Sequence, residues 1–215
     1  TIFHKGTAIV EEKIKEKNEK YIYQLEKIIT ENKLAPENYY YLYQLGKSYS
    51  VVNKHREAFD NFFQSYQLYK KNYSVNENYF NEPIFINILL KITEELLLHL
   101  QEYQQAEPFI NELFNINPNF PDSLFYQGFC QEKMSRFGEA IQSFEKALKL
   151  LNVDSINLFP GIVSQEKELL PSIYIELARC CFINGNEEKY GLYISEAYRL
   201  SPESSLVLLQ LEKYY

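Results

Sequence analysis

Residues 121–154 read PDSLFYQGFCQEKMSRFGEAIQSFEKALKLLNVD, and this stretch decides the fold class. When the stretch is numbered from one, large residues fall at positions 4 and 24, which are Leu124 and Phe144. Small residues fall at positions 8 and 20, which are Gly128 and Ala140. Small side chains let two antiparallel helices approach where they cross, while large side chains fill the space beside the crossing. The pattern therefore predicts two packed antiparallel helices.

The same template fits three further stretches, which begin at Tyr39, Asn87 and Pro171. Recurrence at about 34 residues is the period of the tetratricopeptide repeat, which this chain resembles. The resemblance implies an all-α fold, in which antiparallel helix pairs stack into a right-handed superhelix, an α-α solenoid. The expected repeats are residues 39–72, 87–120, 121–154 and 171–204.

The segments outside the repeats are expected to cap or interrupt the stack. Residues 1–38 carry apolar residues at helical spacing and predict an N-terminal junction with a long capping helix. Residues 205–215 predict a terminal capping helix. Residues 73–86 and 155–170 are insertions, which in solenoids leave from one edge and can modify a binding face. Tolerated loop growth is the simpler explanation of each insertion.

Composition and charge disfavour several classes of partner. The chain of 215 residues has a formal net charge of −7 and a sequence pI near 5.2, which argues against nucleic acid and anionic membranes. No apolar run reaches the roughly 20 residues that span a bilayer. The three cysteines, Cys130, Cys180 and Cys181, lack the spacing of a disulfide framework and favour a cytoplasmic location. The chain begins at Thr1, which suggests a segment of a longer protein.

The sequence contains little that resembles a catalytic or metal site. Three aspartates occur, Asp60, Asp122 and Asp154, so an Asp-X-Asp metal motif is absent, as are Gly-rich phosphate loops and paired-cysteine zinc motifs. His55 and His99 fall at inter-helix turns far apart in the predicted stack, where solvated surface is the expected environment. The chain is therefore predicted to be no enzyme and to bind neither a cofactor nor a metal.

A partner-binding groove is predicted instead. In tetratricopeptide stacks, positions 2, 5, 9 and 12 of the first helix of each repeat face the concave groove. The chaperone-tail-binding members carry Lys and Asn at positions 5 and 9 of their first clamp repeat, whereas this chain carries Tyr43 and Lys47, so that specificity is not expected. Exposed aromatic rings bury large areas against a partner with few rotors. The candidate partner-binding residues are Tyr40, Tyr43, Lys47, Lys91, Phe125, Phe129 and Arg179.

Residues 1–32 read TIFHKGTAIVEEKIKEKNEKYIYQLEKIITEN. This stretch resembles the junction between the catalytic domain and the repeats of bacterial family 2 glycosyltransferases with C-terminal tetratricopeptide repeats. The insertion with Pro160-Gly161 resembles the same architecture, whereas Lys5, Thr7 and Glu19 depart from it. The matching residues are Ile2, His4, Gly6, Val10, Lys13, Lys17, Asn18, Leu25 and Glu26.

The resemblance implies that Ile-X-His-X-Gly forms the strand that closes a sugar-transferring domain, followed by a helix. That domain would be absent from this chain, with His4 as its last remnant; a histidine in a frayed tail is the simpler interpretation.

Two functional hypotheses follow. The first is a scaffold module, the non-catalytic C-terminal region of a glycosyltransferase-like protein, which binds acceptor, packs on the adjoining catalytic domain or self-associates into a homo-oligomer. The second is a free-standing adaptor that holds a protein or peptide in the concave groove without any enzymatic link. Phe125 and Phe129 would become core residues if one of the insertions folds over them.

Overall fold

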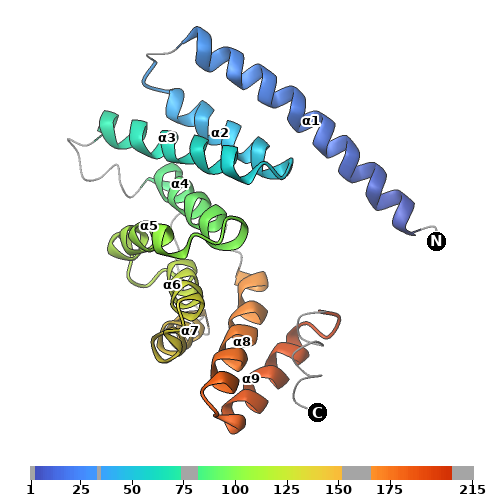
Figure 1. Ribbon diagram of the computed structural model, residues 1–215, viewed down its shortest axis with the longest axis vertical. Helices are drawn as coiled ribbons and strands as arrows, with labels where there is room; N and C mark the ends of the chain where they lie inside the picture. Colours follow the sequence, from blue (N-terminus) through green and yellow to red (C-terminus); the bar gives the residue numbers. More distant parts are fainter. Residues whose placement is uncertain (1–2, 33–34, 74–81, 152–165, 205–215) are drawn as a thin grey trace. The chain divides into compact units, whose positions relative to one another are not determined.

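The computed structural model describes residues 3–32, 35–73, 82–151 and 166–204 (Figure 1). Every regular element in these ranges is a helix, which confirms the predicted all-α fold. The chain divides into two compact units, residues 1–101 and 102–215, so the expected repeat 87–120 is shared between them. None of the helices in the described ranges combines the length and the hydropathy needed to cross a membrane.

The first unit is a series of helices ending in a π-helical turn. Its described elements are α1 (Phe3–Glu31), α2 (Asn38–Val51), α3 (His55–Tyr73), α4 (Pro83–Glu94) and the turn η2 (Glu95–His99). Helix α2 packs against both α1 and α3, and α3 packs against α4 and η2. The core of this unit is apolar and tightly closed, since Phe62, Phe85 and Leu89 have no exposed surface.

The second unit repeats the same arrangement of consecutive packed helices. Its described elements are α5 (Tyr103–Ile116), α6 (Pro121–Lys133), α7 (Phe137–Leu151), α8 (Glu166–Ile183) and α9 (Glu187–Leu200). Each of these helices packs on the next one along the chain, and α8 also contacts α6. One apolar cluster joins α6, α7, α8 and α9, and its fully buried members include Phe144, Ile173 and Leu177.

The two units contain the same helix crossing. A Cβ atom built on Gly46 would lie 2.7 Å from the ring of Phe62, and one built on Gly128 would lie 2.7 Å from the ring of Phe144. Each glycine faces a phenylalanine of the following helix. A methyl group in place of the glycine hydrogen would push the two helix backbones apart. Gly128 therefore lies at the helix crossing where the sequence predicted a small residue.

A left-handed residue follows the first helix of each of the four expected repeats. These residues are Asn53 (φ 59°), Gln101 (φ 57°), Ser135 (φ 62°) and Gly185 (φ 71°). Counted from residues 39, 87, 121 and 171, each one is residue 15, so the turns share one register position. After three of them the next backbone N–H donates to a carbonyl five residues earlier, which is a Schellman motif: Lys54 to Tyr49, Arg136 to Gln131 and Asn186 to Cys181.

Two helices begin before the expected repeat boundaries. Helix α4 begins at Pro83 instead of Asn87, and proline is well suited to the first turn because its missing N–H needs no partner there. Helix α8 begins at Glu166, which leaves Pro171 inside it. The earlier start carries Leu169 into the core of the second unit, where its side chain is buried.

The strand expected near the N-terminus is not formed. Residues 3–6 lie in α1, so the Ile-X-His-X-Gly interpretation of this segment is wrong. A helix satisfies its backbone hydrogen bonds internally, whereas a strand needs a neighbouring strand to pair with. The expected capping helix at 205–215, the Pro160-Gly161 motif and most of both insertions lie outside the described residues.

Candidate interaction surface

An apolar cleft opens where α1 leaves α2. Figure 1 shows α1 as the longer helix, continuing past the end of α2. Leu25, Ile28 and Ile29 on its C-terminal half are partly covered, whereas residues 12–17 are all exposed. A cleft of about 410 Å³ lies between the two helices, and we call it the N-terminal cleft. It is lined by Asn18, Tyr21, Leu25, Gln44, Lys47, Ser48 and Val51.

The lining of the N-terminal cleft combines apolar surface with one cation. Val51 is 48% exposed and Tyr21 is 45% exposed, so both present apolar surface to solvent. The Lys47 ammonium lies 5.5 Å from the centroid of the Tyr43 ring, and no described carboxylate forms an ion pair with it. Small-molecule sites usually enclose roughly 300–1,000 Å³. The cleft can therefore take an apolar group that stands beside a negatively charged one.

The other candidate residues of the first unit differ in what they offer to a partner. Tyr40 is 47% exposed on α2, as expected for a binding residue. Tyr43 is 8% exposed and its ring lies 5.8 Å from that of Phe62, so the expectation of an exposed ring is wrong. Burial raises the pKa of the Tyr43 hydroxyl, and Glu94 raises it further. Lys91 is half-buried and forms an ion pair with Glu94.

Phe125 and Phe129 are half-buried on α6 in the second unit. Both pack against its apolar cluster, and the Phe125 ring lies 5.9 Å from that of Phe144. The Lys133 ammonium lies over the Phe129 ring, 4.6 Å from the ring centroid. One side of each ring therefore belongs to the core. The two insertions that could cover the other side, residues 73–86 and 155–170, lie mostly outside the described residues.

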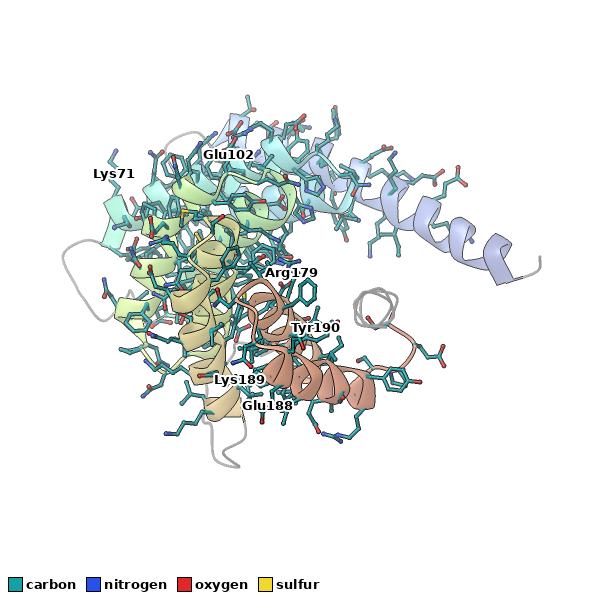
Figure 2. The ribbon with its side chains drawn as sticks, turned by 60° about the horizontal axis from the view of Figure 1, so that its bottom comes forward. Lys71, Glu102, Arg179, Glu188, Lys189 and Tyr190 are labelled. Atoms are coloured by element: carbon teal, nitrogen blue, oxygen red, sulfur yellow. The ribbon has the colours of Figure 1, made fainter. Side chains whose placement is uncertain are left out.

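Arg179 is engaged by acidic side chains of its own unit. It is labelled on α8 in Figure 2, and its guanidinium lies 2.5 Å from a Glu132 carboxylate oxygen and 3.0 Å from one of Glu176. Burial would lower the pKa of Arg179, but the hydrogen bond to Glu132 and the charge of Glu176 outweigh it and raise the pKa. Desolvation raises the pKa of Glu176, which Arg179 opposes. A partner would have to compete with these pairs to use Arg179.

Two histidines come together in the first unit, contrary to the expectation that they lie far apart on solvated turns. The rings of His55 and His99 stack with centroids 3.8 Å apart and planes inclined by 7°. His55 Nδ1 lies 2.9 Å from Oε2 of Glu95, whose side chain is 1% exposed. His55 is the first residue of α3, and His99 is the last residue of η2. Since η2 packs against α3, the two histidines are brought together.

Several solved structures share the helical architecture of this chain. No family model matches the sequence. The structure is similar to that of MamA residues 41 to the end from Desulfovibrio magneticus RS-1, with a TM-score of 0.64 and 14% identity over 92% of this chain and 97% of the other. It is similar to YrrB, described as a TPR protein with an unusual peptide-binding site (TM-score 0.64, 16% identity, 92% and 84% covered).

A tetratricopeptide repeat protein from Parabacteroides merdae ATCC 43184 is also similar, with a TM-score of 0.66 and 18% identity over 95% of this chain and 72% of the other. The chain has the tetratricopeptide-repeat fold. At such low identity, the likeness establishes the helical solenoid and transfers no binding residue from these proteins.

In the tetratricopeptide-repeat fold, the groove position of Lys47 predicts a binding role for this residue. The groove positions do not include the apolar residues that line the N-terminal cleft. Tyr21 and Leu25 were assigned to a capping helix, and Val51 follows the last groove position of its helix. The usable signal was the length of the first amphipathic stretch, which exceeds that of the helix it packs on. A longer helix leaves part of its apolar stripe without a neighbour.

Proposed function

We propose that this chain is a protein-interaction module whose N-terminal cleft holds an apolar side chain of a partner peptide next to an acidic group. The observation that carries the proposal is the placement of Lys47 at the edge of an apolar cleft of about 410 Å³. Tyr21 and Val51 supply exposed apolar surface, which a partner would cover. Lys47 supplies a charge for the acidic group, which sets orientation and specificity more than affinity.

Two further observations support this proposal. YrrB, which shares the fold, is described as having a peptide-binding site. Phe125 and Phe129 are less suitable anchors because both already pack against the core of the second unit. The proposal therefore relies on the first unit.

The link to a glycosyltransferase finds no support in the described residues, since the junction strand is replaced by α1. A free-standing adaptor is compatible with the fold, and binding at the N-terminal cleft does not depend on what else is joined to the chain. The proposal assigns no chemical step to the described side chains.

The test is a selection of peptides on the intact chain from a displayed random library, followed by affinity measurement with one selected, dye-labelled peptide. We expect the selected peptides to share a large apolar residue flanked by Asp or Glu. Lys47→Glu turns an attractive contact into a repulsive one and should weaken binding by roughly tenfold, equivalent to about 1.4 kcal/mol. Val51→Ser should also weaken it, because a polar group replaces apolar surface in the cleft.

Lys71→Glu is the matched control because it makes the same change of charge on the same unit. Lys71 is exposed in the last turn of α3, does not line the N-terminal cleft, and is labelled in Figure 2. It should leave the affinity unchanged. Equal binding by wild type and Lys47→Glu, or equal losses in Lys47→Glu and Lys71→Glu, would remove the N-terminal cleft as the binding site.

A further inference from the structure

Three side chains with metal-binding atoms converge in the first unit, and none of them lines the N-terminal cleft. They are His55 at the start of α3, and Glu95 and His99 at the two ends of η2. One ligand atom from each lies within 4.8 Å of the other two. His55 is separated from Glu95 by 40 residues of sequence, so the cluster is created by the packing of η2 on α3.

The Glu95 carboxylate is an unusual group to bury here. Its side chain is 1% exposed, and no lysine or arginine in the described ranges forms an ion pair with it. Its polar contact is with His55, at 2.9 Å. Buried carboxylates normally require a cationic partner or a metal ion because the cost of leaving water is large.

The repeat fold does not require this cluster. Register positions equivalent to His55, Glu95 and His99 recur where the third repeat precedes the fourth, and there they hold Phe137, Arg179 and Ile183. Within the described residues, that junction packs without a similar cluster. The π-helical turn is a second local departure, since the Leu100 N–H donates to the Glu95 carbonyl, five residues earlier, at 2.9 Å. Single π-helical turns are frequently found at functional sites.

We propose that His55, Glu95 and His99 bind one divalent transition-metal ion, with Zn²⁺ as the representative case. Two imidazoles and one carboxylate are a donor set that suits Zn²⁺, Cu²⁺, Ni²⁺ and Co²⁺, whereas Mg²⁺ and Ca²⁺ prefer oxygen ligands throughout. Three protein ligands leave the remaining coordination position to water. The ion neutralises the buried carboxylate and connects α3 to η2.

Metal binding requires a small rearrangement, which identifies His99 as the closing ligand. Ligand atoms around a tetrahedral Zn²⁺ are roughly 3.4 Å apart, given bonds of about 2.1 Å. The parallel rings cannot both direct a lone pair at one ion, so one ring must turn. His99 is exposed and its terminal torsion is soft, while His55 is held by Glu95. Glu95 and His55 therefore form the fixed half of the site.

The test is competition between the tag-free chain and a chromophoric zinc chelator, with Co²⁺ absorption as a second readout. We expect one Zn²⁺ per chain, a rise in melting temperature with Zn²⁺ but not with Mg²⁺ or Ca²⁺, and a Co²⁺ spectrum without thiolate charge transfer. The spectrum matters because the chain also contains three cysteines. His99→Ala should weaken Zn²⁺ binding by more than the roughly 10–100-fold that loss of an outer-shell partner costs.

His99→Ala is the decisive variant because His99 is exposed, so its removal should leave the helical circular dichroism unchanged. His4→Ala, which removes the remaining histidine, is the matched control and should bind Zn²⁺ as wild type does. Unchanged Zn²⁺ affinity in His99→Ala would overturn the proposal and leave a stacked histidine pair with one hydrogen bond to Glu95. A thiolate signature in the Co²⁺ spectrum would overturn it as well. Either result leaves peptide binding at the N-terminal cleft untouched.

Discussion

A single methyl group tests the helix crossing in the second unit. In Gly128→Ala the new Cβ atom would lie 2.7 Å from Cε1, 2.8 Å from Cδ1 and 3.0 Å from Cγ of Phe144. Phe144 is fully buried and its ring packs against that of Phe125, so it has little room to withdraw. Overpacking of this kind costs about 1–3 kcal/mol, whereas alanine exceeds glycine in helix stability by about 1 kcal/mol. We therefore expect a net loss of about 1 kcal/mol in the free energy of unfolding.

Gly138→Ala provides the matched control within the same helix pair. Gly138 lies in the first turn of α7, and a Cβ atom built on it would have no neighbour within 4 Å, so only the gain in helix propensity applies. It should stabilise the chain by about 0.5–1 kcal/mol. Urea unfolding followed by circular dichroism measures both variants. In a Phe144→Leu background the cost of Gly128→Ala should shrink, since the obstructing ring is gone. Equal stabilisation by Gly128→Ala and Gly138→Ala would refute the crossing contact.

Phe144→Ala should lower the free energy of unfolding by about 3–5 kcal/mol in the same urea assay, and a change near zero would show that this ring is not core. Burial raises the pKa of the Cys130 thiol to about 11 and that of Cys180 to about 12, so the folded chain should react slowly with thiol reagents at neutral pH and quickly once unfolded. Rapid labelling of the folded chain would contradict this. The hydrogen bond from Lys189 holds the pKa of Glu145 below its usual range, and the stability it contributes is present above the unfolded pKa and lost as pH falls through the folded pKa. Glu145→Gln should therefore flatten the acid limb of the stability curve, and an unchanged limb would refute the pairing.

Much of the fold was predictable because each repeat contains its own helix crossing within a short stretch of sequence. Gly128 and Phe144 lie 16 residues apart in one helical hairpin, and their sizes alone indicate that two helices cross there. Helix starts were harder to place, as Pro83 and Glu166 show. Proline can begin a helix or follow its start, and only the burial of residues such as Leu169 decides how far the helix extends.

The candidate binding residues show the same difference between what local register predicts and what tertiary packing decides. Register position alone selected Lys47, which does line the N-terminal cleft. It could not reveal that Tyr43 is covered, since that depends on how Phe62 of α3 packs beside it.

What the sequence by itself determined is the class of the protein: helical, repetitive, acidic and built from antiparallel pairs, because each property follows from spacing and composition. What only the tertiary structure decided is which distant side chains meet. The cluster of His55, Glu95 and His99 depends on the packing of η2 on α3, which brings together residues 40 or more positions apart in the sequence, and no local pattern encodes such a contact. Periodicity specifies the face of a helix, whereas convergence of three polar groups on one point requires the positions of two helices at once.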